Sequence, residues 1–360
     1  MSSHSQVSRL TRKDLHGPRY ATFLKEIFAM EDVNSRVAWI KWLFQDNPAV
    51  AESESLTIYT YCDDKGIVGQ LGILPCPTFL HGNFVRNGWC VDFHVLERAQ
   101  RKGVGGKLLQ AAYTDFEMLS TLGQTDLSYN LFLKLGWHQI GLMTSCKRLL
   151  NIQRAIPKML IHKAKMFKPN QCAHQVIHGW SGDVIGTVAV KILSNLSGCE
   201  ELMADRNSYT QKCFVKKTVE LMNWRYVNCP QEPYTILLLN HGGAQAIAVL
   251  RLYTINGWRR GHLIDLLYGG TMSADQVSVI MHAIEIFMSK SGVEVFEAET
   301  SDAQVLNWFA SGPLSVKTQT TRFLYGTPDG SVFPTAMRDW MLFTGDCDID
   351  IVNGLFLSGQ

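Results

Sequence analysis

The sequence lacks a strong excess of charge of either sign. Its 34 lysines and arginines nearly balance 32 aspartates and glutamates, which leaves a formal net charge of +2. A surface that follows the phosphates of a nucleic acid usually carries a clear basic excess, so the charge gives little support to such a partner. Hydrophobic residues make up 46% and charged residues 18% of the chain, which is typical of a soluble globular protein.

Disulfide and zinc-binding patterns are missing as well. The nine cysteines are scattered, with no CxxC pair and no cluster of cysteine and histidine at zinc spacing. This usage suits free thiols in a reducing compartment. No metal site is predicted.

Long apolar runs are also absent. The N-terminal stretch MSSHSQVSRLTRKDLHG has no apolar core of the signal-peptide kind. The run TILLL at 235–239 is far shorter than the roughly 20 residues that cross a bilayer. These features predict a cytoplasmic protein with no membrane contact, and a homodimer is left open.

The order of predicted elements suggests a duplication. A length of 360 residues fits two domains of about 150 to 180 residues each. The first half reads as a helix near 35–47, two strands within 56–74, a strand at 88–95 and further helices. A basic connecting segment at 150–170 precedes a helical stretch at 200–226, more strands and two more helices. We therefore predict domains at 1–160 and 161–360.

One short loop combines glycine, positive charge and the start of a helix. Residues 95–110 read VLERAQRKGVGGKLLQ and directly follow a predicted strand. The first N–H groups of a helix have no partner inside it, and a strand that enters there with glycines makes a cradle for an anion. The spacing fits neither GxGxxG nor GxxxxGK[ST]. A plain glycine-rich turn is the alternative.

The loop resembles that of a known superfamily. The segment QRKGVG at 100–105 resembles (Q/R)xxGx(G/A), the acyl-CoA loop of the GNAT superfamily of N-acetyltransferases. VDFHV stands where that superfamily has its central strand, and TDLSYNLFLKLGWHQIG resembles its later helix and strand, so the resemblance covers most of 30–147. It implies an α/β fold with a splayed mixed sheet and acyl-CoA as cosubstrate. The implied cofactor-binding residues are Val95, Gln100, Arg101, Lys102, Gly103, Val104, Gly105 and Gly106.

Two residues before the loop are candidates for the chemistry. An amine must be neutral to attack a thioester, so a general base is expected within reach. Asp92 and His94 share one face of the strand because side chains alternate. A histidine suits the base, and Asp92 could hold it or bind the acceptor's ammonium group. Structural roles for both residues are the alternative. The resemblance implies an oxyanion donor at the backbone N–H near Val95.

The sequence departs from the superfamily at the expected general acid. The resemblance places Phe132 where a tyrosine usually protonates the leaving thiolate, and phenylalanine cannot donate. Tyr129, one helical turn earlier, could substitute, or could be a packed aromatic residue. A thiolate with a pKa of about 8.5 can also leave without a strong acid. The acid is therefore unassigned. Gly105→Glu is expected to abolish CoA binding and to leave the fold intact.

The second half resembles the same superfamily only in outline. Gly269 and Gly270 stand at the corresponding turn without the cations or the GxG spacing, so this half is predicted to be a degenerate GNAT-like domain that binds the acceptor. WRYVNCPQEPY and GDCDID resemble elements of two-domain acyltransferases found beside nucleotide-sugar biosynthesis. The predicted substrate-binding residues, for which core packing is the alternative, are Asp265, Trp224, Arg225 and Tyr226.

The predicted function is therefore CoA-dependent N-acyl transfer to the amine of an amino sugar, which the resemblance predicts to be nucleotide-linked. One alternative is a peptidyl transferase that uses aminoacyl-tRNA, which the weak charge disfavours. The other is an acyl-CoA-binding protein without catalysis, which the absent tyrosine permits.

Overall fold

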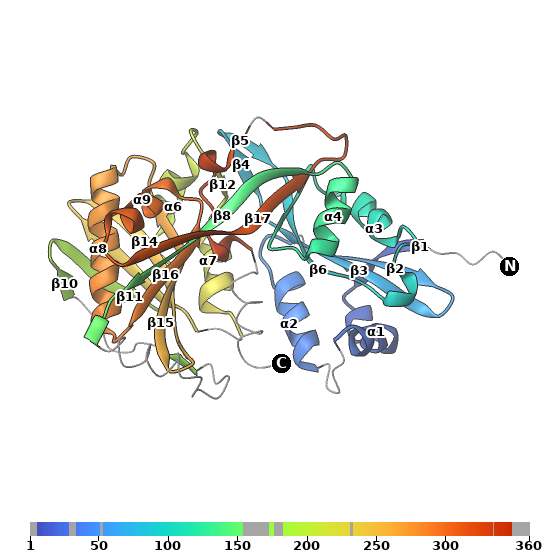
Figure 1. The fold of residues 1–360 in the computed structure, drawn as a ribbon. Coiled ribbons are helices and arrows are strands. Elements are labelled where there is room, and N and C mark those ends of the chain that lie inside the picture. Colours follow the sequence, from blue (N-terminus) through green and yellow to red (C-terminus); the bar gives the residue numbers. More distant parts are fainter. Residues whose placement is uncertain are drawn as a thin grey trace. The chain divides into compact units, whose positions relative to one another are not determined.

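The computed structural model of the chain describes residues 6–28, 34–50, 53–153, 173–175, 183–230, 233–333 and 335–347. Strands and helices alternate along the chain in a mixed α/β fold (Figure 1). The chain divides into two compact units. The first unit comprises Met1–Thr78, Phe84–Gly141 and Arg322–Pro334, and the second comprises Phe79–Asn83, Leu142–Thr321 and Thr335–Gln360.

The first unit is built on a mixed sheet with the strand order β1-β2-β3-β6-β7-β17. Neighbouring strands are antiparallel except for β6 and β7, which are parallel. The turn DDKG at residues 63–66 joins β2 to β3, where the Asp63 side chain accepts hydrogen bonds from the N–H groups of Lys65 and Gly66. The strands are β1 (Gln6–Thr11), β2 (Ser55–Asp63), β3 (Gly66–Pro75), β6 (Asn87–Val95), β7 (Met118–Leu122) and β17 (Ser315–Gly326).

Helices cover both faces of this sheet (Figure 1). On one face lie α1 (Pro18–Phe28) and α2 (Asn34–Phe44), and on the other lie α3 (Val104–Ala112) and α4 (Asp126–Lys134). Two glycines of β3 allow close packing. A Cβ atom at Gly69 would lie 2.8 Å from Val104 of α3, and one at Gly72 would lie 2.5 Å from Phe44 of α2. The predicted helix at 35–47 is thus confirmed as α2.

The parallel strands β6 and β7 separate along their length. Their register runs from Asn87 opposite Met118 only to Trp89 opposite Ser120. Beyond that point β6 stays paired with β3 as far as Val95, whereas β7 stays paired with β17 as far as Leu122. The sheet of this unit therefore splays as predicted, and the second half of β6 has no described strand on its β7 side.

The second unit repeats this plan around its own mixed sheet, in the order β8-β16-β15-β14-β13-β11-β10, with β9 also paired to β14. Only β15 and β16 are parallel. The strands are β8 (His138–Leu149), β9 (Ala173–Gln175), β10 (Asp183–Ile185), β11 (Val188–Leu193), β13 (Thr235–His241), β14 (Ala244–Ile255), β15 (Trp258–Tyr268) and β16 (Val295–Thr300).

Two apolar clusters cover the faces of this second sheet. One includes Ile280 and Phe287 of α8 (Ala274–Lys290) and Trp308 of α9 (Ala303–Ser311). The other includes Met203 of α6 (Glu200–Asn207) and Met222 of α7 (Val219–Met222). Burial of these side chains provides the driving force that holds the helices on the sheet.

The halves of the sequence exchange their last strands. Each half contains a strand, a helix, a strand, a helix and a strand in the same order, which confirms the tandem mixed-sheet fold class. These elements are β6–α3–β7–α4–β8 in the first half and β15–α8–β16–α9–β17 in the second. However, the end of β8 pairs with β16 in the second unit, for example Leu149 opposite Val295. The end of β17 pairs with β7 in the first unit, for example Phe323 opposite Leu122. The two units therefore differ from the single division after residue 160 that the sequence predicts.

The predicted helical stretch at 200–226 is interrupted. Between α6 and α7 lies the short strand β12 (Cys213–Val215), and α7 continues as a π-helical turn at Asn223–Val227. The C-terminal segment contacts this strand: Met341 N–H donates to the Cys213 carbonyl at 2.9 Å. β12 also adjoins the hairpin of β4 (Thr78–Leu80) and β5 (Asn83–Val85). Most of the predicted connecting segment at 150–170 lies outside the described residues.

Candidate active site

The glycine loop bends sharply between β6 and α3. Gly103 has φ of +77° and is the N-cap of α3, where no side chain caps the helix. Arg101 has φ of +60°. Both values lie in the left-handed region, which glycine adopts without the steric cost that other residues incur. The conformation turns the backbone at 101–103 directly into the first turn of the helix.

Six consecutive backbone N–H groups of this loop have no hydrogen-bond acceptor among the described residues. The first hydrogen bond of α3 is donated by Lys107 N–H to the Gly103 carbonyl at 3.2 Å. The N–H groups of residues 101–106 have no acceptor within the described part of the chain. Unpartnered amides at a helix N-terminus carry partial positive charge and bind anions such as phosphates. The residues present therefore fit a diphosphate.

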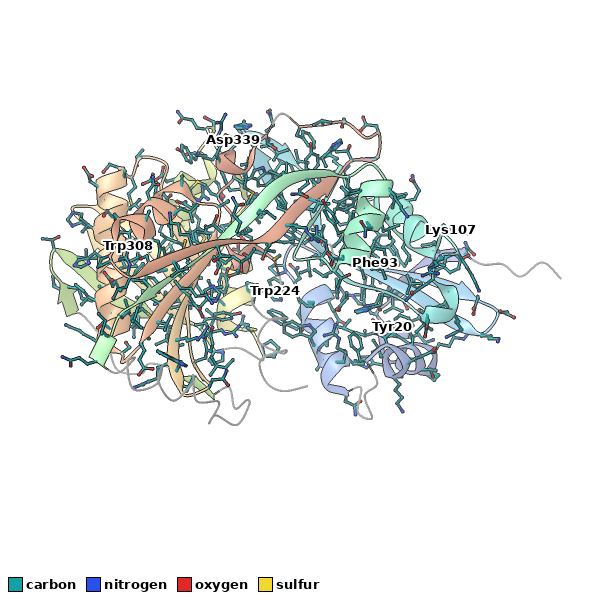
Figure 2. All side chains as sticks on the ribbon, in the orientation of Figure 1. Tyr20, Phe93, Lys107, Trp224, Trp308 and Asp339 are labelled. Carbon is teal, nitrogen blue, oxygen red and sulfur yellow. The ribbon has the colours of Figure 1, made fainter. Side chains whose placement is uncertain are left out.

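The three glycines differ in the space above them. A Cβ atom at Gly103 would have no neighbour within 4 Å, and one at Gly106 would meet only Leu135, at 3.7 Å. At Gly105, by contrast, it would lie 2.8 Å from Leu131 and 3.1 Å from Phe93, the β6 residue labelled in Figure 2. A side chain at position 105 would therefore require Leu131 of α4 to move, and the expectation that Gly105→Glu leaves the fold intact stays a prediction.

The other predicted loop residues lie at the same place. The side chains of Arg101 and Lys102 are exposed and form no ion pair with a described acid. Val104 is 3% exposed, so it offers the loop only its N–H group. Gln100 donates a hydrogen bond from Nε2 to the Val95 carbonyl at 3.1 Å. This bond ties the loop to the end of β6.

Val95 presents its backbone to the opening beside β6. Leu96 N–H donates to the Val68 carbonyl of β3 at 2.9 Å, and Val95 stands opposite Gly69. Bonded and non-bonded pairs alternate along antiparallel strands, so the Val95 N–H points away from β3. The predicted oxyanion donor is thus directed toward the side from which β7 has departed. Its catalytic role stays a prediction.

Asp92 sits at an irregularity of β6. The register with β3 shifts between Gln70, opposite His94, and Gly72, opposite Val91. Asp92 has φ of +46°, which is uncommon for a residue other than glycine and costs free energy that neighbouring contacts must offset. The strand therefore contains a β-bulge at the candidate residue, which simple alternation of side chains does not anticipate.

An arginine from α2 holds the Asp92 carboxylate. Arg36 Nη2 forms a short charged hydrogen bond to Asp92 Oδ1, and its guanidinium lies 4.4 Å from the centroid of the Phe28 ring. Burial opposes ionisation of Asp92, but Arg36 and His94 together outweigh it and lower its pKa to about 2. The second carboxylate oxygen, Oδ2, is buried without a hydrogen-bond partner among the described residues. Asp92 is therefore ionised at neutral pH.

His94 is the accessible member of this group. Its Nε2 lies 3.9 Å from Asp92 Oδ1, and its side chain is 33% exposed, against 11% for Asp92. The ring packs edge-on against Phe28 with 5.1 Å between centroids. The structure thus brings together the predicted pair and adds Arg36, which no feature of the sequence pointed out.

Tyr129, the predicted substitute for the general acid, forms contacts with other side chains. Tyr129 donates its hydroxyl hydrogen to Gln139 at 2.7 Å, and the Arg322 guanidinium lies 4.4 Å from its ring centroid. Phe132 is 1% exposed and packs against Trp137, with ring centroids 4.3 Å apart. A catalytic role for Tyr129 stays a prediction, and Phe132 is a core residue.

The predicted acceptor-binding residues lie in the interior of the second unit. Asp265 accepts hydrogen bonds from Lys217 at 2.7 Å and from the Tyr226 hydroxyl at 2.8 Å. Lys217 also forms an ion pair with Asp346 at 2.5 Å. Arg225 donates to the Cys347 carbonyl at 2.9 Å.

All four predicted residues are less than a tenth exposed: Asp265 2%, Tyr226 2%, Arg225 6% and Trp224 8%. Such burial is typical of residues that pack the interior. Contact with an acceptor stays a prediction for each of them.

In the second half, the turn at the position of the glycine loop has its helix N-terminus capped by side chains. The Ser273 side chain accepts a hydrogen bond from Gln276 N–H at 3.2 Å, and the Gln276 side chain accepts one from Ser273 N–H at 2.9 Å. This capping box satisfies amides that an anion would need, and Asp275 adds negative charge in the first turn. The degenerate character predicted for this half thus has a physical cause.

Other kinds of site are not found in the part of the chain that the structure describes. No group of three or more histidine, cysteine, aspartate or glutamate side chains could hold a metal ion there. None of the described helices is both long and apolar enough to cross a membrane. The described cysteines are free thiols.

Comparison with known proteins supports this interpretation of the first half. Residues 22–125, less than a third of the chain, match the Acetyltransferase (GNAT) family. Enzymes of this family are N-acyltransferases that use acetyl-CoA or acyl-CoA as cosubstrate, and the match supports this activity for the part of the chain that it covers. A comparison with curated proteins gives no match by sequence.

Solved structures resemble both halves of the chain. A GCN5-related N-acetyltransferase from Anabaena variabilis is 11% identical, with a TM-score of 0.61 over 90% of this chain and 72% of that one. Eis1 from Mycobacterium abscessus is 12% identical, with a TM-score of 0.52 over 89% and 72%. N-myristoyltransferase from Saccharomyces cerevisiae, solved with bound myristoyl-CoA, is 10% identical, with a TM-score of 0.51 over 89% and 82%. At these identities the likeness shows the fold.

Proposed function

We propose that the protein transfers an acyl group from acyl-CoA to the amine of a nucleotide-linked amino sugar, and that the site lies between the glycine loop and the end of β6. The observation that carries this proposal is the run of six unpartnered N–H groups at 101–106, directly behind a strand whose free side faces the splay of the sheet.

In this proposal the loop binds the diphosphate and the strand positions the thioester. The amides of residues 101–106 and the side chains of Arg101 and Lys102 face the negative charge. Acyl-CoA supplies the thioester carbonyl. The Val95 N–H donates a hydrogen bond to the oxygen that becomes negative when the amine adds to the carbonyl carbon.

The amine proton passes to His94. As the C–N bond forms and the C–S bond breaks, the nitrogen must lose a proton, and His94, whose side chain is 33% exposed, is the imidazole on the strand that leads into the loop. The Asp92 carboxylate, 3.9 Å away, stabilises the imidazolium that results. CoA leaves as a thiolate, for which no strong acid is required.

The acceptor class is supported by the resemblance of WRYVNCPQEPY and GDCDID to nucleotide-sugar acyltransferases. Trp224, Arg225 and Tyr226 are buried within the second unit, so their burial itself gives no support to direct contact with the sugar.

The test measures thiol release from acetyl-CoA with a panel of free amino sugars, nucleotide-linked amino sugars and simple amines, with products identified by mass spectrometry. We expect an N-acetylated product with a nucleotide-linked amino sugar, and a loss of about 100-fold or more in kcat for His94→Gln with unchanged CoA affinity. CoA binding without any N-acylated product would overturn the proposal in favour of a binding protein.

A further inference from the structure

A buried arginine lies behind the candidate base, and neither the sequence motif nor the family assigns it a role. Arg36 belongs to α2, on the face of the first unit's sheet opposite the glycine loop. Its side chain is 13% exposed. Its guanidinium contacts the Asp92 carboxylate and the face of the Phe28 ring, and its Nε is buried without a hydrogen-bond partner among the described residues.

The environment of Asp92 shows that its position is set from several elements. Its carboxylate is held by Arg36 of α2, and its backbone carbonyl lies 3.5 Å from Gln70 Nε2 of β3. Gln70 is itself fixed, because its Oε1 accepts a hydrogen bond of 2.6 Å from the Tyr20 hydroxyl of α1, and Tyr20 is labelled in Figure 2. A left-handed backbone conformation that costs free energy is maintained by contacts of this kind.

The same oxygen atom of Asp92 faces both cationic neighbours. Arg36 Nη2 and His94 Nε2 both approach Oδ1. Phe28 contacts both as well, with its face toward Arg36 and with His94 at its edge. The Asp92 carboxylate therefore lies between the Arg36 guanidinium, which is 13% exposed, and the His94 imidazole, which is 33% exposed.

We propose that Arg36 is a positioning residue: it fixes the Asp92 carboxylate in the one orientation that holds His94 ready to accept the amine proton. The inference rests on the proposed function, because it concerns the base of that reaction. In this proposal Arg36, whose side chain is 13% exposed, acts through Asp92. Asp92 and His94 therefore have different roles. Because Arg36 keeps the Asp92 carboxylate ionised, Asp92 is a poor proton acceptor, and in this proposal the proton of the amine goes to His94.

Lysine and glutamine at position 36 separate this role from a structural one. Arg36→Gln removes the charge, and Arg36→Lys keeps it but loses the planar guanidinium that bonds Asp92 and stacks on Phe28. We expect kcat to fall about 100-fold in Arg36→Gln and about 10-fold in Arg36→Lys. KM for acyl-CoA and CoA affinity by calorimetry should stay within about twofold, because the loop is formed by other residues.

A matched control is Arg98→Gln. Arg98 belongs to a turn at Glu97–Ala99, and its ion pair with Glu26, at 2.5 Å, is exposed. This variant removes an arginine charge from the same unit away from Asp92. Its kcat should be unchanged.

A second measurement does not depend on activity. The Asp92 carboxyl, observed by carbon NMR, should titrate at a higher pH in Arg36→Gln than in the wild type, and at nearly the wild-type pH in Arg98→Gln. Unchanged kcat in Arg36→Gln, or an Asp92 titration that does not move, would overturn the inference. Absence of N-acylation in the wild type would instead overturn the proposed function, while the titration would still report whether Arg36 sets the state of Asp92.

Discussion

The Arg148 guanidinium lies 3.6 Å from the centroid of the Trp308 ring and donates a hydrogen bond of 2.6 Å to the Trp308 carbonyl. Arg148 is on β8 and Trp308, labelled in Figure 2, is on α9. The same side chain also bonds Ser315 and Glu285. A strand from the first half of the sequence thus closes the end of a helix in the second unit.

Arg148→Met should destabilise the protein by about 2 to 4 kcal/mol. The change leaves the Trp308 carbonyl of the last helical turn without its buried donor and removes a charged hydrogen bond. Urea unfolding measures the difference. The control is Arg86→Met, whose ion pair with Glu117 is largely exposed and should matter little. Equal effects of the two variants would contradict the role given to Arg148.

A fragment of residues 1–160 should not fold by itself. It lacks residues 322–326 of β17, so β7 would lose its antiparallel partner and expose an unpaired edge. We expect a non-cooperative thermal transition and aggregation for 1–160, and a cooperative transition when 161–360 is coexpressed and copurified with it. A stable, cooperative and monomeric 1–160 fragment would show that the exchanged strand is dispensable.

Much of the first half could be predicted from the sequence because its signals are local. The turn DDKG, the strand before the loop and the glycines at 103–106 each depend on neighbouring residues. The exchange of β8 and β17 could not be predicted, because pairing such as Phe323 with Leu122 joins segments about 200 positions apart and leaves no local pattern.

Only part of the candidate site can be predicted from the sequence. Asp92 and His94 precede the loop on one strand, and their spacing predicted them as a pair. Arg36 lies 56 positions earlier, at the start of a helix whose pattern reports only apolar residues. The same limit applies to Asp265: its position on a strand gave no sign that Lys217 and Asp346 enclose it.

Lys217→Met should be strongly destabilising. Burial opposes the charge of Lys217, but Asp265 and Asp346 outweigh this and raise its pKa, so the lysine is charged between two buried acids. Its removal would leave two carboxylates facing each other, at a cost of about 3 to 5 kcal/mol. Urea unfolding measures this cost. A triple variant in which Asp265 and Asp346 are also replaced by asparagine should regain part of the lost stability, because no buried carboxylate is left unpaired. A loss of less than about 1 kcal/mol in Lys217→Met would contradict the account.

The contribution of Asp92 to stability should depend on pH. Its folded-state pKa of about 2 lies below the ordinary 3.8, so it stabilises the fold above pH 4 by about 2 kcal/mol and loses this as pH falls toward 2. The gap in unfolding free energy between wild type and Asp92→Asn should narrow by about 1 kcal/mol from pH 5 to pH 3.

A control for this pH dependence is Asp126→Asn. Asp126 is 84% exposed and pairs with Arg322 at 2.7 Å, so the gap between this variant and the wild type should stay nearly constant with pH. A constant gap for Asp92→Asn as well would mean that Asp92 is not held ionised in the folded state.

The central claim is that the backbone N–H groups of residues 101–106 bind the diphosphate of acyl-CoA. Calorimetric titration of CoA into the wild type and two variants of α3 tests this claim most directly. Gly106→Glu adds a carboxylate at the helix N-terminus, where a Cβ atom meets only Leu135 at 3.7 Å. Gln110→Glu adds the same charge at an exposed position further along the helix. The account predicts tight binding by the wild type and Gln110→Glu, and a loss of at least 10-fold in Gly106→Glu with an unchanged unfolding transition. Equal CoA affinity in all three proteins would contradict it.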